Sequence, residues 1–240
     1  KLRSALETER NYNELNKNLV SMVSHEFRTP LTSINSTAEL LIQYADRFTA
    51  EDIIKRVERI YSSAQKMDSL IQDVLTIGKL ESNNTSFDYR EFDFSEMVTS
   101  LITVLSSTIL KERDVVINAD TEINTLCLDQ NMMELILRNL LENAGKYSHP
   151  PEKIILTYSI TNQELKLSCQ DFGIGIPEKD RELVFESFVR GSNTQDIKGT
   201  GLGLPIVKKS VERMGGSIKL DSEVGQGTTI SITIPVTTTN

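Results

Sequence analysis

The chain has 240 residues, 38% of them hydrophobic and 25% charged, which allows one or two ordinary globular domains. Its net charge of −8, without clustered lysines and arginines, argues against nucleic acid as a partner. No run approaches the roughly 18 apolar residues of a membrane span and no signal peptide opens the chain, so we expect a soluble cytoplasmic piece without membrane contact.

The two cysteines and the N-terminus lead to two further expectations about the chain. Cys127 and Cys169 stand alone in apolar stretches without metal-ligand spacing, so we expect buried thiols in a reducing compartment and no metal site there. The chain begins at Lys1 without methionine, already in a charged helical pattern. We therefore expect a fragment whose upstream part is missing.

Two long helices are predicted first, from residue 1 to about 45 and from about 50 to 80, with Thr49 and Asp52 capping the second. One hairpin cannot bury both of its apolar faces, so we expect a dimeric four-helix bundle; a monomeric hairpin packed on the rest of the chain is the alternative. The second helix carries the predicted seam, in steps of four and three: Ile53, Val57, Ile60, Ala64, Met67, Ile71 and Val74.

A histidine beside an acid lies within the first of these helices. Val23 and Phe27 belong to the apolar face, so His25 between them is predicted to point toward water. An incidental surface histidine is the simplest explanation. However, Glu26 can orient the ring or take its proton, which leaves a neutral imidazole as a nucleophile, and Pro30 is predicted to bend the helix nearby.

The pattern changes after a linker at residues 81–86, and strands mix with helices without regular alternation. This favours an α+β layer sandwich. Helices are predicted from Asp93, which caps the first one, to about 112, and at 130–147 and 203–214. Strands are predicted at 87–94, 115–119, 125–128, 154–160, 165–170, 217–222 and 228–235.

The helix predicted at 130–147 has a polar face opposite its apolar stripe. Asn139, Asn143 and Lys146 share that face at spacings of four and three. Amide oxygens suit a hard cation such as Mg²⁺ held jointly with phosphates, and an ammonium suits the phosphates themselves. An ordinary solvated face is the alternative.

Two glycine clusters accompany this helix, at residues 171–177 and 198–204. Alternate glycines allow the backbone to approach a ligand closely, and the second cluster runs into a helix whose N-terminal amides can hold anions. Asp171 could accept a hydrogen bond from an exocyclic amine such as that of adenine. Either cluster alone could also be a turn.

Taken together, these motifs resemble those of sensor histidine kinases. His-Glu-Phe-Arg-Thr-Pro-Leu-Thr at 25–32 resembles the H-box, in which the matching histidine is phosphorylated. The other matches are the N-box at 139–147, the G1 box at 171–175, the F-box at 185–191, the G2 box at 199–203 and a Gly-Thr-Thr element at 225–229.

This resemblance implies a helical hairpin at 1–82 that dimerises and carries the phosphoacceptor. A linker and first strand at 83–92 and a Bergerat-type (GHKL) ATP-binding domain at 87–240 follow. It implies that Asn143, helped by Asn139, ligates Mg²⁺, and that Lys146 and Arg190 meet the phosphates. Tyr147 would lie by the ribose or adenine and Asp171 would bind the adenine amine. Further ATP contacts are implied for Gly173, Gly175, Ile176, Phe188, Lys198, Gly199, Thr200, Gly201, Leu202, Gly203, Leu204 and Thr228.

The resemblance thus implies an ATP-dependent protein-histidine kinase that autophosphorylates His25 and passes the phosphoryl group to an aspartate on a response regulator receiver domain. An upstream sensor domain would precede it. Glu26 is the candidate base, and Glu26 with Thr29 matches the E-x-x-T pattern associated with dephosphorylation of the partner. The alternatives are a Bergerat-fold ATPase that drives conformational change and a non-catalytic dimer module.

Overall fold

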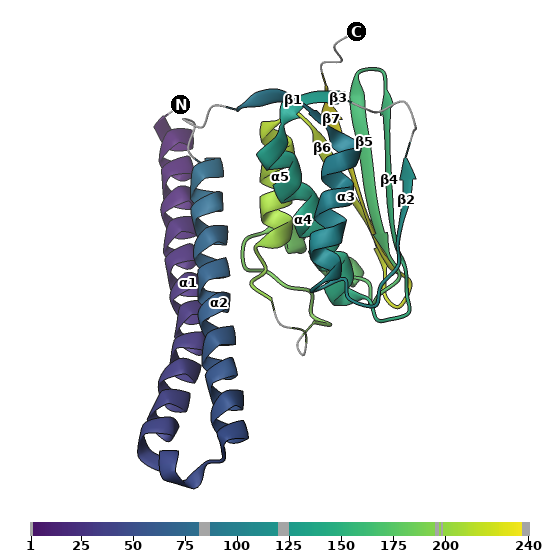
Figure 1. Ribbon diagram of the computed structural model, residues 1–240. Helices are drawn as coiled ribbons and strands as arrows, with labels where there is room; N and C mark the ends of the chain where they lie inside the picture. The colour runs from purple at the N-terminus through teal and green to yellow at the C-terminus, as the bar shows by residue number, and fades with distance from the viewer. Residues whose placement is uncertain (1, 82–86, 120–124, 195–196, 198, 237–240) are drawn as a thin grey trace. The chain divides into compact units, whose positions relative to one another are not determined.

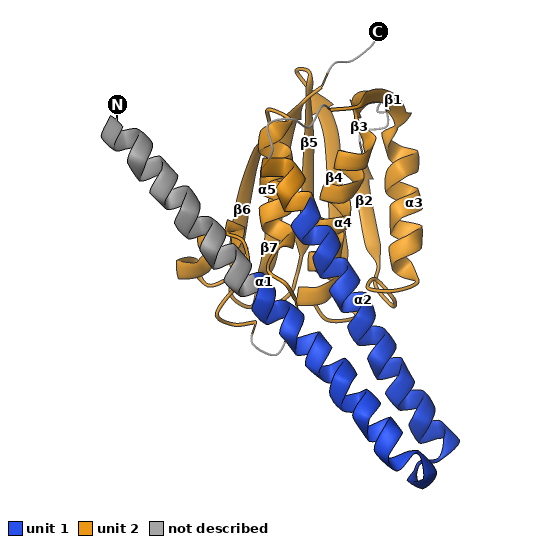
Figure 2. Ribbon diagram, turned by 90° about the vertical axis from the view of Figure 1, so that its left-hand side faces the viewer, with its two compact units in different colours: residues 1–75 blue, residues 76–240 orange. Residues whose placement is uncertain are grey.

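The computed structural model describes residues 2–81, 87–119, 125–194, 197 and 199–236, with side chains described from residue 23 onward. Its contacts divide the chain into two compact units, residues 1–75 and 76–240 (Figure 2). In the described part of the chain, no helix is both long enough and apolar enough to span a membrane.

The first unit is a helical hairpin (Figure 1). Helix α1 spans Leu2–Tyr44 and continues through Pro30, the short 3-10 helix η1 spans Ala45–Arg47, and α2 spans Ala50–Glu81, with its last residues in the second unit. Both long helices confirm the predicted ranges to within a few residues.

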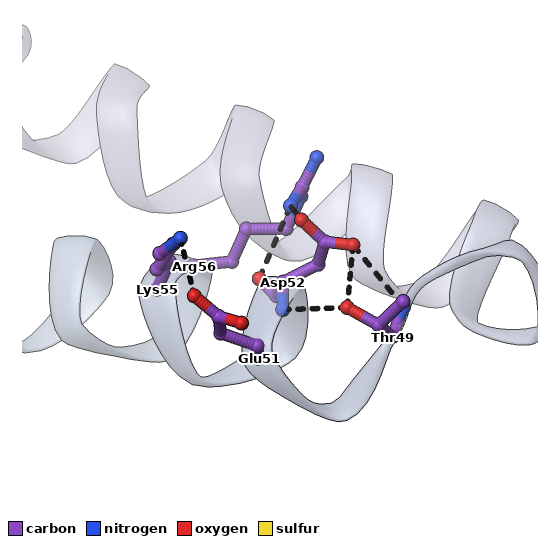
Figure 3. Close-up of polar contacts among 5 residues, drawn as sticks. All are labelled: Thr49, Glu51, Asp52, Lys55 and Arg56. Carbon is purple, nitrogen blue, oxygen red and sulfur yellow. Dashed lines mark hydrogen bonds and ion pairs between the residues drawn. The ribbon is translucent and has the colours of Figure 1, made fainter.

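The start of α2 is fixed by a reciprocal cap (Figure 3). The backbone N–H of Asp52 donates to the Thr49 hydroxyl at 3.2 Å, while the Thr49 hydroxyl and backbone N–H donate to the Asp52 carboxylate at 2.7 and 3.2 Å. These bonds lower the pKa of Asp52. They satisfy backbone donors that have no partner within the helix, so the predicted cap is confirmed.

The predicted seam of α2 has two rows. Ile60 and Met67 are half-buried, whereas Val57, Ala64 and Ile71, seven residues apart, are exposed; Val57 retains 51% of its surface and Ile71 41%. An exposed apolar row with a heptad repeat is typical of a helix that packs against further helices.

The second unit contains a five-stranded sheet in the order β2-β4-β5-β7-β6 and a separate antiparallel pair, β1-β3. Within the larger sheet only β2 and β4 are parallel. The larger sheet consists of β2 (Val115–Ala119), β4 (Ile154–Thr161), β5 (Glu164–Asp171), β6 (Ser217–Glu223) and β7 (Gly227–Pro235). The pair consists of β1 (Tyr89–Asp93) and β3 (Thr125–Asp129).

Three helices cover one face of this sheet: α3 (Phe94–Ser106), α4 (Gln130–Tyr147) and α5 (Gly203–Arg213) (Figure 1). Their apolar stripes and the inward residues of the strands form one core, in which Leu137, Leu141 and Leu165 are fully buried. The predicted helical hairpin followed by an α/β sandwich is therefore confirmed.

Helix α3 is shorter than predicted, ending at Ser106 instead of about residue 112. Beyond Ser106 the chain forms three-residue turns, in which Ser107 and Thr108 donate both the backbone N–H and the hydroxyl to the carbonyls of Val104 and Leu105. These hydroxyl bonds compete with continuation of the α-helix. Tight turns follow, and Glu112 has a φ of 64°. The predicted start of α3 is confirmed, since the Asp93 carboxylate accepts from the N–H of Glu96 at 2.8 Å.

Candidate functional site: an ATP-binding helix face and an exposed histidine

The candidate phosphoacceptor lies in the first unit, on α1. The His25 side chain retains 74% of its surface and Glu26 42%, and the His25 Nδ1 atom lies 3.6 Å from the Glu26 carboxylate. This distance is within ion-pair range and longer than a hydrogen bond. The carboxylate therefore faces Nδ1, and Nε2 is the ring nitrogen farther from it. Thr29, one helical turn further on, is also exposed.

The amides predicted to bind a cation lie side by side at the start of α5. Asn139 donates its Nδ2 to the carbonyl of Leu135 at 2.8 Å. A Cβ atom built on Gly203 would lie 2.9 Å from the Asn139 Oδ1 atom and 3.3 Å from the Asn143 Nδ2 atom. Glycine at the first position of α5 therefore lets this helix end approach both amides.

Lys146 and Tyr147 lie next to the second glycine cluster. The Lys146 ammonium is 4.8 Å from the centroid of the Tyr147 ring, within cation–π range. A Cβ atom on Gly199 would overlap the Lys146 Nζ atom, so the backbone at Gly199 lies directly against this cation. The structure thus brings the G2 box to the polar face of α4.

The G1 box packs against the C-terminal end of the same helix. The N–H of Ile174 donates to the carbonyl of Tyr147 at 3.0 Å, and a Cβ atom on Gly173 would overlap that carbonyl. Gly175 has a φ of 64°, and a Cβ atom there would overlap the carbonyl of Glu223. Both positions therefore require glycine for a close backbone approach.

Asp171 ends β5 with its side chain only 8% exposed. Its carboxylate accepts a hydrogen bond from the N–H of Gly173 at 2.9 Å and another from the N–H of Thr228. Burial raises the pKa of Asp171 to about 6, against the opposing effect of these two donors and of the Arg113 guanidinium. The carboxylate is therefore ionised at neutral pH but is costly to keep buried.

Arg113 and Ser148 support this site and were not predicted. The Arg113 guanidinium donates to the hydroxyl and the carbonyl of Ser148, at 2.7 and 2.5 Å, and the Ser148 hydroxyl donates to the carbonyl of Ala144 at 2.6 Å. Arg113 thereby ties the loop before β2 to the C-terminal end of α4. The two residues are 35 positions apart, and no spacing in the sequence indicates that they pair.

The F-box meets the G2 box through a backbone bond. The N–H of Phe188 donates to the carbonyl of Gly201 at 3.0 Å, and both residues have positive φ values, 66° and 71°. Arg190 donates its Nη2 to the carbonyls of Thr194 and Ile197, and the structure does not bring it to α4.

The remaining predicted residues lie around these clusters. The Thr200 hydroxyl accepts from the N–H of Leu202, which is fully buried, and Leu204 packs against the core. The N–H of Ile176 donates to the Ser222 hydroxyl, which lies 2.9 Å from that of Thr228. Lys198 lies outside the described residues.

The residues on α4 fit a nucleotide with a divalent cation. They offer two amide side chains and one ammonium beside glycines that keep the backbone close. Among the residues that the structure describes, no three His, Cys, Asp or Glu side chains cluster as metal ligands. A cation here would therefore depend on amide oxygens together with the phosphates of a ligand, a ligand set that suits Mg²⁺.

The fold and this site define a class: a phosphoacceptor-type helical hairpin followed by an ATP-binding domain. Two family models agree. "His Kinase A (phospho-acceptor) domain" matches residues 15–83, and "Histidine kinase-, DNA gyrase B-, and HSP90-like ATPase" matches residues 128–238.

Known proteins are similar over nearly the whole chain. Sensor histidine kinase WalK of Bacillus subtilis is 35% identical over 226 residues, covering 91% of this chain and 36% of WalK. Adaptive-response sensory kinase SasA of Prochlorococcus marinus is 33% identical over 239 residues, covering 98% of this chain and 61% of SasA. The chain therefore spans about one third to three fifths of the length of these relatives.

Solved structures show the same arrangement of elements. Full-length ShkA in complex with AMPPNP is 26% identical with a TM-score of 0.69, covering 92% of this chain and 46% of ShkA. Histidine kinase ThkA, solved with the response regulator TrrA, is 23% identical with a TM-score of 0.74, covering 95% of this chain and 64% of ThkA. At 23% identity, the similarity to ThkA shows the fold alone.

The chain belongs to the sensor histidine kinases with HisKA and HATPase_c domains.

The buried carboxylate of Asp171 gives a testable pH dependence. With a pKa of about 6 in the folded protein and near 3.8 when unfolded, the native state keeps its proton to higher pH. The parent should therefore lose stability relative to the Asp171→Asn variant as pH rises from about 4 to about 6, by on the order of 2 to 3 kcal/mol. Urea unfolding of both proteins between about pH 4.5 and 7.5 measures this; a pH-independent difference would contradict the raised pKa.

Proposed function

We propose that this chain is the catalytic part of an ATP-dependent protein-histidine kinase that phosphorylates its own His25. The observation that carries the proposal is the exposed His25 ring with the Glu26 carboxylate facing Nδ1. A carboxylate on this side favours the tautomer with hydrogen on Nδ1, which leaves the Nε2 lone pair free for nucleophilic attack. A Bergerat-fold ATPase that only drives conformational change has no use for such a histidine.

The second domain would bind the phosphoryl donor. We assign Asn143 and Asn139 as ligands of Mg²⁺, Lys146 and Arg190 as phosphate contacts and Asp171 as the acceptor for the adenine amine. The side-by-side amides, the Lys146 ammonium against Gly199 and the buried Asp171 support the roles of these four residues, and the role of Arg190 rests on the resemblance of the F-box alone. Bound ATP with Mg²⁺ would supply the phosphoryl group. The functional division into 1–82, a linker with the first strand at 83–92, and 87–240 belongs to the same proposal.

We further propose that the hairpin forms a homodimer and that the phosphoryl group passes to a response regulator receiver domain. The exposed row of Val57, Ala64 and Ile71 supports the dimer. An upstream sensor domain and the activity of the whole protein belong to the same proposal, because the chain spans only part of the length of its relatives.

The kinase activity is tested by labelling with γ-labelled ATP and Mg²⁺. Phosphohistidine is lost in acid, so an acid-labile label is expected on the parent. His25→Gln should remove the label while ATP affinity stays near that of the parent, and Asn143→Ala should lose ATP affinity. In mixed dimers of the two variants, label on the Asn143→Ala chain would indicate transfer across the dimer, and its absence transfer within a chain. An acid-stable label, or full labelling of the His25→Gln variant, would contradict the proposal.

The dimer is tested with charges in the exposed row. Val57→Lys with Ile71→Lys should dissociate the protein into monomers, because each lysine would otherwise be buried without a partner at a cost of several kcal/mol. Ser62→Lys with Ser69→Lys adds the same charges to exposed positions on another face of α2 and should leave the dimer intact. Sedimentation velocity gives the result; if the Val57→Lys, Ile71→Lys protein sediments as an unchanged dimer, this seam is ruled out.

Thr29 separates kinase from phosphatase activity. It is exposed one turn from His25, so its hydroxyl can position a water against a phospho-aspartate of the regulator. Thr29→Ala should keep most autophosphorylation and lose regulator dephosphorylation at an unchanged melting temperature. The alternative role is a hydroxyl bonded to a carbonyl freed by Pro30. Loss of both activities together with thermal stability would support that role and remove Thr29 from the catalytic residues.

A further inference from the structure

A short segment after the F-box, residues 190–194, is tied to the loop that follows the G1 box. Asp180, the last residue of the 3-10 helix η2 (Glu178–Asp180), is only 8% exposed. Its Oδ2 atom accepts two hydrogen bonds from Ser192, one from the backbone N–H and one from the hydroxyl, both 2.7 Å long. Both bonds end on a charged acceptor, which makes them stronger than bonds between neutral groups.

A second bond ties the same segment to the G1 box itself. Asn193 donates its Nδ2 to the carbonyl of Gly175 at 2.9 Å. Gly175 has a positive φ and lies close to the backbone at Glu223, so it has little freedom to move. Asn193 therefore joins the segment to a rigid part of the candidate nucleotide site.

The segment is also closed on itself. The Thr194 hydroxyl and N–H both donate to the carbonyl of Gly191, at 2.7 and 3.0 Å, and Thr194 is 7% exposed. Arg190 donates to the carbonyls of Thr194 and Ile197. Residues 190–194 thus form a compact turn whose outer attachments are Asp180 and Gly175.

We propose that Asp180, with Asn193, is a positioning residue for ATP: the two hold the turn at 190–194 against the G1 box in the arrangement that binds nucleotide. This inference rests on the proposed function, since it assumes that the G1 and G2 boxes hold ATP. Residues 190–194 would otherwise have to be ordered when the nucleotide binds. Fixing them beforehand removes that entropy cost and raises affinity.

The charge of Asp180 strengthens its contact with Ser192. The Ser192 donors lower the pKa of Asp180, so the carboxylate is ionised at neutral pH. Lys179 on η2 also lowers this pKa, and the charged residues Arg181 and Glu182 directly follow Asp180 in the sequence. Replacing Asp180 with asparagine keeps the shape and one oxygen but removes the charge, so it tests the bonds to Ser192 without opening a cavity.

The test is ATP affinity, measured by calorimetric titration of the full chain with ATP and Mg²⁺. Asp180→Asn should raise Kd about tenfold, and Ser192→Ala and Asn193→Ala each about threefold. Ser192→Thr keeps the hydroxyl and should restore near-parent affinity. Glu182→Gln removes an exposed carboxylate two residues from Asp180 and should leave Kd unchanged.

A purely structural role predicts a different pattern. For positioning, Asp180→Asn and Ser192→Ala should be non-additive in Kd, since both weaken the same contact. Melting temperature and labelling at saturating ATP should stay near those of the parent. If affinity, labelling and melting temperature fall together, or the two effects add fully, the inference is wrong. Where Asp180→Asn does not fold, the Kd values of Ser192→Ala and Asn193→Ala decide the question by themselves.

The failure of this inference differs from failure of the proposed function. If the parent binds no ATP, both are wrong. If the parent binds ATP and the Ser192 and Asn193 variants bind it equally well, only the positioning role is wrong, and the nucleotide site stands without it.

Discussion

The candidate nucleotide site depends on one close backbone contact, where the carbonyl of Tyr147 accepts from the N–H of Ile174 and Gly173 leaves no room for a side chain. This contact sets the end of α4 against the G1 box. Because α4 also carries Asn139 and Asn143 against Gly203, the same helix faces both glycine clusters. The polar face of α4 therefore lines the candidate site, and glycine is needed where another segment's backbone approaches this helix closely.

Close to that contact lies a buried carboxylate, whose charged form is destabilised by the loss of water around it. Asp171 is nearly buried, and burial raises the pKa of its carboxyl to about 6 although two N–H groups and Arg113 act in the opposite direction. Such a carboxylate has few water molecules to compete for it, so a ligand amine that reaches it gains a strong acceptor. Arg113 contributes twice, because it also holds Ser148 at the end of α4.

The hairpin differs from the second unit, because its candidate functional groups are exposed to solvent. His25 keeps most of its surface and has a carboxylate beside Nδ1, which agrees with the proposed role of a phosphoacceptor. The rows of α2 divide in the same way, with Ile60 and Met67 half-buried and the Val57 row exposed. An exposed apolar row and an exposed histidine on one hairpin agree with a module that works by contact with other surfaces.

The sequence by itself determined the elements and most of the candidate residues. Helical and strand periodicity, the Thr49 and Asp93 caps and the paired glycine clusters act over a few residues, so they can be recognised in order along the chain. The predicted end of α3 was wrong, because the Ser107 and Thr108 hydroxyls bond back three residues to the carbonyls of Val104 and Leu105. Only the tertiary structure decided that Arg113 meets Ser148 and that Asp180 meets Ser192. These pairs join loops across 35 and 12 positions, and their bonds depend on how the helices and strands pack, which no local pattern encodes.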